Sequence, residues 1–171
     1  MPRTQMRSDA GDGQGNTLLM RAALDGQTNQ VETLLHKGAD VNAQNCEGRT
    51  ALMFAIINVR AATVKTLLES GADVNVQARC GCTPLMLAAC SGDIGIIRAL
   101  LNRGADAGKV SGMGRTALMV AAEHGYTTIG ELIKQATVQL TPANLINDSP
   151  DRHRMSDFSS RQMNRQLVEI K

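Results

Sequence analysis

Short apolar blocks alternate with short glycine-rich polar blocks along most of this chain, and the alternation has a fixed interval. Four similar strings are GNTLLMRAALDG, GRTALMFAIINV, GCTPLMLAACSG and GRTALMVAAEHG; successive strings lie 33 residues apart and begin at Gly15, Gly48, Gly81 and Gly114. A second string, Gly-Ala-Asp, recurs with the same interval at Gly38, Gly71 and Gly104. Two motifs that keep a constant phase indicate one structural unit repeated along the chain.

The pattern inside each unit predicts a helix, a turn and a second helix. In the third unit, apolar residues recur at spacings of three and four, typical of one buried helix face; they are Leu85, Leu87, Ala88 and Ala89, then Ile94, Ile97, Leu100 and Leu101. Thr83 followed by Pro84 is typical of a helix start, because the hydroxyl accepts from a free backbone amide and proline lacks only an N–H that would be unpaired there. Gly92 and Gly104 stand where the two helices are expected to end.

Such units are expected to stack, because two helices of about two turns each are too short to persist alone in water. Small residues recur where the first helices of neighbouring units would meet. They are Ala22, Ala23, Ala55, Ala88, Ala89, Ala121 and Ala122. We expect a larger side chain in this seam to overpack it.

A 33-residue unit that begins with Thr-Pro-Leu and places alanine after it resembles the ankyrin repeat. The resemblance covers residues 14 to about 136 and implies an all-α ankyrin-repeat solenoid of stacked helix-turn-helix units with short β-hairpin loops. We expect a flexible tail at 1–13 and a repeat domain at 14–136. Its repeats would span about 14–45, 46–78, 79–111 and 112–136.

The chain departs from the family pattern at two places. The family's histidine near the helix start is methionine in every unit, at Met20, Met53, Met86 and Met119. We interpret these methionines as core-filling side chains in preference to a sticky binding surface. The second unit has Val59 where the others have glycine, so we expect its inter-helix turn to differ.

Residues 137–171 follow the last repeat. Their first part is rich in Thr, Pro, Asn, Asp and Ser, typical of a linker, and a final segment, SDFSSRQMNRQLVEIK, has apolar residues near helical spacing. Three interpretations stay open for this final segment. It caps the stack, it is disordered, or it is a helix that docks on a partner.

Composition and charge do not indicate any particular class of ligand. The chain of 171 residues has a formal net charge of +2 and an aromatic content of 2%, which does not favour a nucleic-acid or membrane partner. We find no apolar run typical of a signal peptide or a membrane span, so we expect a cytoplasmic protein with reduced thiols, monomeric when alone.

The resemblance implies protein–protein interaction through the concave face and the hairpin tips. As an adaptor, scaffold or inhibitor, the chain would bind a partner protein of unknown identity. The candidate contact residues are Asn16, Leu24, Asp25, Cys46, Glu47, Arg49, Ile57, Asn58, Arg79, Cys80, Cys82, Cys90, Ser91, Met113, Arg115, Glu123 and His124. The alternative is a structural subunit of a larger assembly.

Any one of these residues could instead be a solvated spacer, but two features favour the use of this set as a binding surface. Leu24, Ile57 and Met113 are apolar at positions expected to be exposed, which often marks an interface. The basic side chains of Arg49, Arg79 and Arg115 are expected to line one edge of this surface, which favours an acidic partner segment.

The four cysteines suggest a further alternative, a thiol-based metal or redox-responsive binder. Cys80 and Cys82 are two residues apart, but zinc sites typically use paired C-x-x-C motifs, so the pattern is weak and we expect no metal. The three histidines, His36, His124 and His153, form no recognised catalytic motif. We therefore expect no catalysis, no cofactor and no small-molecule substrate.

Overall fold

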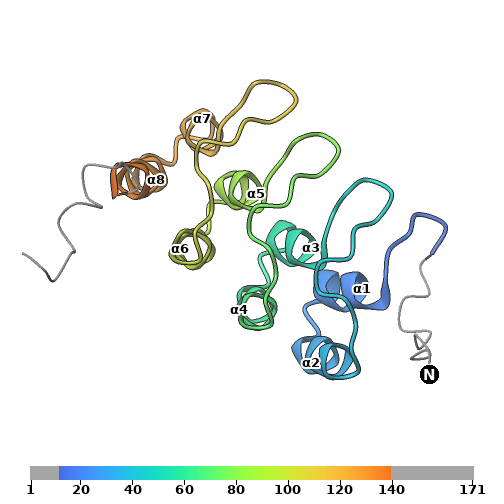
Figure 1. The fold of residues 1–171 in the computed structure, drawn as a ribbon. Coiled ribbons are helices and arrows are strands. Elements are labelled where there is room, and N and C mark those ends of the chain that lie inside the picture. Colours follow the sequence, from blue (N-terminus) through green and yellow to red (C-terminus); the bar gives the residue numbers. More distant parts are fainter. Residues whose placement is uncertain (1–11, 140–171) are drawn as a thin grey trace, which may run out of the picture. The chain divides into compact units, whose positions relative to one another are not determined.

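The computed structural model describes residues 12–139, which contain eight helices and no strand (Figure 1). The helices are α1 (Leu18–Asp25), α2 (Thr28–His36), α3 (Ala51–Ile57), α4 (Ala61–Glu69), α5 (Pro84–Ser91), α6 (Ile94–Asn102), α7 (Ala117–Glu123) and α8 (Thr127–Gln139). As far as Thr137 they belong to one compact unit. The three interpretations of the C-terminal segment lie outside the described residues, as does most of the expected N-terminal tail.

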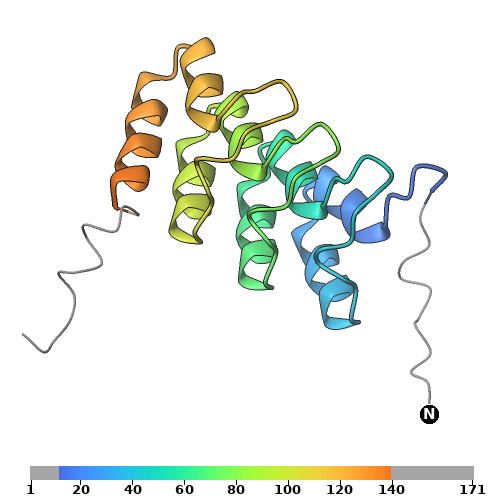
Figure 2. The same cartoon turned by 45° about the horizontal axis from the view of Figure 1, so that its top comes forward.

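The helices of this unit form two layers joined by long loops. Helices α1, α3, α5 and α7, the first helix of each repeat, pack in order as one layer. The second helices, α2, α4, α6 and α8, form the other layer (Figure 1). The loops project away from the helices (Figure 2). Each loop is a hairpin-shaped turn, closed for example by the Asn45 amide donating to the Arg49 carbonyl at 3.0 Å. The predicted solenoid of helix-turn-helix units is confirmed, although the loops contain no strand in the described range.

Asparagine side chains tie each loop to the next one. The amide of Asp73 donates to Asn42 Oδ1 at 2.8 Å, and Asn42 Nδ2 donates to the Gly71 carbonyl. Asn75 repeats both bonds one unit later, with the Asp106 amide and the Gly104 carbonyl. Because each loop is bonded to its neighbour, the hairpins are held in a regular row.

Alanines form the seam between the first helices, as predicted, with one exception. Six of the seven are almost completely buried, and the apolar core continues on both sides of them. Ala122, in the last unit, is exposed, so that prediction is wrong. The last repeat has no following helix pair among the described residues, and its alanine therefore faces outward.

The methionines divide in the same way. Met20, Met53 and Met86 are buried in the core, which confirms that they fill space there. Met119 is 52% exposed, so the core-filling interpretation is wrong for the last repeat. Within residues 12–139, no further unit lies against its position on α7.

The turn between α3 and α4 has the same shape as the other inter-helix turns, contrary to the expectation drawn from Val59. Val59 takes the left-handed conformation, with φ of 53°, that Gly26, Gly92 and Gly125 take in the other units. The Arg60 amide donates to the Ala55 carbonyl, just as the Gln27 amide donates to the Ala22 carbonyl. Packing of the two helices therefore sets the turn, and valine adopts a conformation that suits glycine.

Threonine begins each first helix, but one threonine makes no capping bond. The side chains of Thr17, Thr83 and Thr116 each accept from the amide three residues ahead. Thr50 is buried, and its Oγ1 is the buried side-chain oxygen that lacks a hydrogen-bond partner within residues 12–139. The second repeat therefore contains a desolvated hydroxyl that contributes no bond.

This difference predicts opposite effects for one substitution made at two equivalent positions. Thr83→Val removes a cap and should lower the free energy of unfolding by about 1 kcal/mol. Thr50→Val removes an unpaired hydroxyl and should leave stability unchanged or raise it by up to about 1 kcal/mol. Urea denaturation of both variants checks this, and equal losses of stability would contradict it.

Candidate functional site

The exposed side of the first helices and the hairpins form one continuous surface, which we call the inner face. Two ion pairs join hairpin residues to the helix that follows. Arg21 on α1 contacts Asp12 at 3.2 Å, and Arg115 contacts Glu123, the last residue of α7, at 3.0 Å. In the last repeat, two predicted contact residues, Arg115 of the hairpin and Glu123 of the helix, are therefore in direct contact.

A row of apolar side chains crosses the middle of the inner face. Ile57 is 43% exposed at the end of α3, and Leu24 occupies the equivalent place at the end of α1. Cys90 is the exposed counterpart on α5. Met113, in the last hairpin, is 72% exposed. These residues are as accessible as the sequence predicted.

A second row was missed by the sequence reasoning. Phe54, Leu87 and Val120 are half-buried, and each stands three residues before Ile57, Cys90 and Glu123 respectively. Residues three apart on a helix share a face, so these side chains extend the apolar row sideways. The signal was present in the sequence as another 33-residue series, but of its residues only Leu87 was considered, and it was placed on a buried helix face.

Several candidate polar side chains bond within the protein. Asn16 Oδ1 accepts from Asn45 Nδ2 at 2.8 Å, which joins the first two hairpins. Asn58 donates to the Phe54 carbonyl, and Ser91 donates to the Ala88 carbonyl. Asp25 and Cys46 are exposed. Asn16, Asn58 and Ser91 thus already make hydrogen bonds within the protein, and a partner that contacts them would have to do so alongside these bonds.

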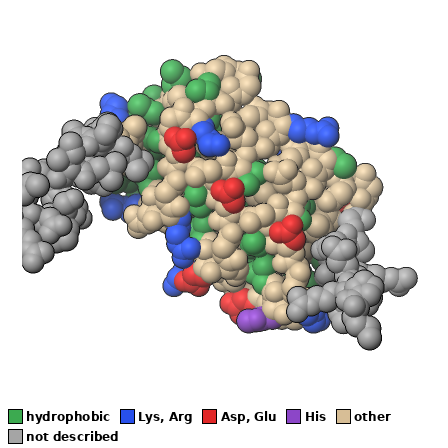
Figure 3. Space-filling model, in the orientation of Figure 1, with side chains coloured by type: hydrophobic (Ala, Val, Ile, Leu, Met, Phe, Trp, Pro, Cys, Tyr) green, Lys and Arg blue, Asp and Glu red, His purple; other side chains and the backbone are tan. Residues whose placement is uncertain are grey.

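The predicted basic edge is largely neutralised. Arg49 Nε lies 3.1 Å from Glu47, and Arg115 is paired with Glu123. Arg79 is exposed and takes part in none of the ion pairs found between described residues. On the face shown in Figure 3, hydrophobic side chains lie among charges of both signs. Charge alone therefore no longer favours an acidic partner.

Cys90 and His124 meet at the end of the inner face. Cys90 Sγ lies 3.6 Å from His124 Nε2, and His124 Nδ1 lies 2.9 Å from the Val120 carbonyl. Since a carbonyl only accepts, Nδ1 carries the proton and Nε2 accepts from the thiol. The ring also stacks on Tyr126, with centroids 5.9 Å apart. These contacts join the ends of α5 and α7.

Cys80 and Cys82 lie together at the tip of the third hairpin. A hydrogen bond from the Cys82 thiol lowers the pKa of Cys80, helped by backbone amides and by the nearby Arg49. Burial raises the pKa of Cys82 to about 11, and the neighbouring Cys80 adds to this rise. No three His, Cys, Asp or Glu side chains of the described part gather as a metal site. The two thiols therefore differ in reactivity although they are neighbours.

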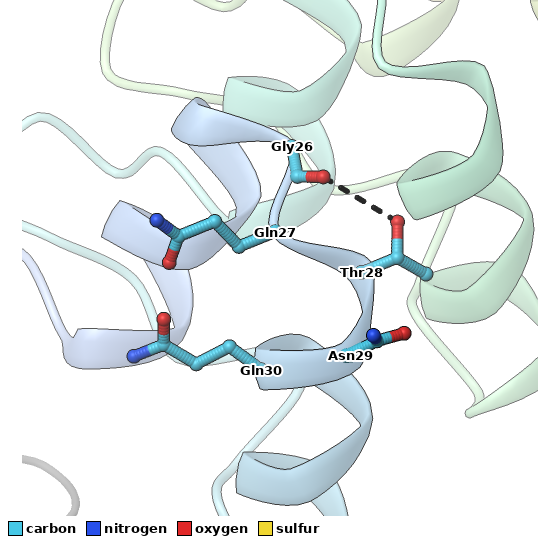
Figure 4. A pocket seen from close by; sticks show the side chains of 5 residues that line it. All are labelled: Gly26, Gln27, Thr28, Asn29 and Gln30. Carbon is cyan, nitrogen blue, oxygen red and sulfur yellow. Dashed lines mark hydrogen bonds between the residues drawn. The ribbon is translucent and has the colours of Figure 1, made fainter.

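An open depression elsewhere on the surface offers little chemistry. It lies at the turn between α1 and α2 and is lined by Gly26, Gln27, Thr28, Asn29 and Gln30 (Figure 4). Thr28 Oγ1 donates to the Gly26 carbonyl at 3.5 Å, while Gln27 and Gln30 point to one side of the turn. Its lining is made of amides, a hydroxyl and backbone, with no ionisable group.

The family is decided by a comparison of the whole chain with known protein families. The model for ankyrin repeats (three copies) matches residues 3–78 and 63–142. The chain belongs to the ankyrin-repeat family. Ankyrin repeats are generally protein–protein interaction modules and are typically not catalytic. No curated protein sequence matches the chain, and no helix in the described part is long and apolar enough to cross a membrane.

Proposed function

We propose that this ankyrin-repeat protein binds a partner protein through its inner face and acts as an adaptor, scaffold or inhibitor. The observation that carries the proposal is the apolar row across α1, α3 and α5, bordered by ion pairs. Leu24, Ile57 and Cys90 are exposed there, with Phe54 and Leu87 half-buried beside them. An apolar centre with a polar rim is the usual composition of a protein interface.

The pairing of the arginines supports an apolar contact over an electrostatic one. Surface ion pairs contribute little free energy, and salt screens them further. Glu47 and Arg49, and Arg115 and Glu123, already satisfy each other. The partner is therefore expected to present a hydrophobic side chain to the centre of the inner face, with Arg79 left available for one acidic contact.

The test compares two double variants with matched chemistry on opposite layers. Ile57→Asp with Arg79→Glu changes the inner face, and Ile94→Asp with Arg98→Glu changes α6 in the second layer. Ile57 and Ile94 are 43% and 40% exposed, and both arginines are exposed. Desolvating a new carboxylate in an apolar interface should weaken binding by at least about tenfold for the inner-face variant only.

The measurement has two stages. Affinity capture with quantitative mass spectrometry first identifies proteins enriched by the wild type and by the α6 variant but lost with the inner-face variant. Titration calorimetry with the purified partner then gives the change in Kd, and circular dichroism melts show that both variants remain folded. A partner that binds both variants with unchanged Kd would place the interface elsewhere.

A further inference from the structure

Cys80 and Cys82 stand at a hairpin tip that is fixed on both sides. The Ala78 amide donates to the Cys82 carbonyl at 3.0 Å and the Gly81 amide donates to the Ala78 carbonyl at 2.7 Å, which closes the turn. Neighbouring hairpins add two bonds, from the Arg79 amide to the Glu47 carbonyl and from the Gly112 amide to the Cys80 carbonyl. The tip is therefore a defined turn in which side-chain positions are set by the backbone.

This turn places side chains two residues apart next to each other. In the preceding hairpin, Glu47 and Arg49 occupy the equivalent positions, and their side chains are in contact at 3.1 Å. In the third hairpin Cys80 and Cys82 occupy these two positions. Residues two apart are separated by at most about 7 Å even in an extended chain, and a bent turn brings them within the range of a disulfide.

The surroundings assign different roles to the two sulfurs. Cys80 is exposed, and the neighbouring Cys82 thiol, backbone amides and the charge of Arg49 lower its pKa. Cys82 is half-buried, so its thiol is desolvated and keeps its proton. An exposed thiol stabilised as thiolate reacts first with an oxidant, and a neighbouring thiol can then resolve the product.

We propose that Cys80 and Cys82 form a peroxide-responsive dithiol, with Cys80 as the thiol that is oxidised and Cys82 as the one that resolves it. The Cys80 thiolate attacks one oxygen of hydrogen peroxide, the O–O bond breaks, and hydroxide leaves and takes up a proton to become water. The Cys82 sulfur then attacks the Cys80 sulfenic acid. The S–S bond forms, the S–O bond breaks, and a second water leaves with the Cys82 proton. Two thiols and one peroxide thus give one disulfide and two waters, whether or not a partner is bound.

The experiment uses the full chain with Cys46→Ser and Cys90→Ser, so that only the proposed pair remains. The reduced protein is exposed to hydrogen peroxide, alkylated at intervals and weighed intact. We expect both thiols to be lost together, the mass to fall by two hydrogen atoms, the protein to stay monomeric, and dithiothreitol to reverse the change. Separate loss of the thiols, or disulfides only between molecules, would overturn the proposal.

Single-thiol variants on this background test the order of the steps. With Cys82→Ser, Cys80 should be trapped by dimedone as a sulfenic acid, because serine keeps a donor but cannot resolve the product. With Cys80→Ser, Cys82 should react with iodoacetamide about tenfold more slowly at neutral pH than Cys80 does in the other variant. Equal rates would contradict the assigned roles.

Arg49 offers a further check, because its charge lowers the pKa of both thiols. Arg49→Met on the two-thiol background should slow disulfide formation severalfold, and Arg49→Lys should restore most of the rate. A circular dichroism melt establishes that each variant is folded. An unchanged rate in Arg49→Met would show that the environment of Cys80 is not what selects it.

Discussion

Replacing Ala88 with leucine should lower the free energy of unfolding by about 1–3 kcal/mol, because the site has no room for three more carbon atoms. Ala88 is completely buried on α5, which packs between α3 and α7. Its equivalents are Ala22, Ala55 and Ala121, so this row is alanine in every repeat. The next row already contains Ile56 in the second repeat, which indicates that it tolerates size better.

Ala122→Leu is the matched control. The same substitution is made on a first helix, but Ala122 is exposed and lines an open depression beside α8. Its stability should change by less than about 0.5 kcal/mol. Chemical denaturation monitored by circular dichroism compares the two variants, and a stability for Ala88→Leu equal to that of the control would show that the seam is not close-packed.

The repeat interval was enough to predict the architecture. Motifs that recur at one interval predicted the helix pairs, the helix start at Thr83 and the stacking of the units, because these depend on local pattern and on burial of one face. Errors are concentrated in the last repeat. Met119 and Ala122 match their equivalents in sequence, but they are exposed, and the described residues include no further repeat beyond them. A repeat pattern describes a unit and says nothing of what covers it.

The inner face was predicted less completely than the fold. Sequence spacing placed Ile57 and Met113 on an exposed surface, where the structure has them. It could not show that Arg49 and Arg115 are already paired, since an ion pair depends on side-chain rotamers and not on spacing. It also placed Leu87 on a buried face, because a half-buried residue has the same pattern as a buried one.

Val59 shows why a local rule can fail while the fold holds. Glycine is favoured at left-handed positions, so its absence suggested a different turn. Yet the helices on both sides bury Ala55, Ile56 and Val64, and together these contacts outweigh an unfavourable residue conformation. Strain of this size persists when the surrounding structure determines the backbone.

Val59→Gly should therefore raise the free energy of unfolding by about 1 kcal/mol. An L-residue in the left-handed region costs roughly 1–2 kcal/mol, and glycine removes this cost. Glycine also makes the unfolded chain more flexible, which favours unfolding and cancels part of the gain in stability. The valine side chain is 45% exposed, so its removal leaves no sealed cavity. Thermal denaturation should give a rise in Tm of a few degrees.

Gly125→Val applies the opposite change to an equivalent turn. Gly125 has φ of 73°, and a Cβ added there meets no atom within 4 Å, so a loss of stability caused by the Cβ reports backbone strain and not a clash. We expect a loss of about 1–2 kcal/mol. Gly26 and Gly92 would be poorer controls, because a Cβ at either would meet the side chain of Arg60 or Tyr126. If Val59→Gly destabilised the protein while Gly125→Val did not, the valine would be stabilising its turn through contacts, and left-handed strain would be the wrong account of this position.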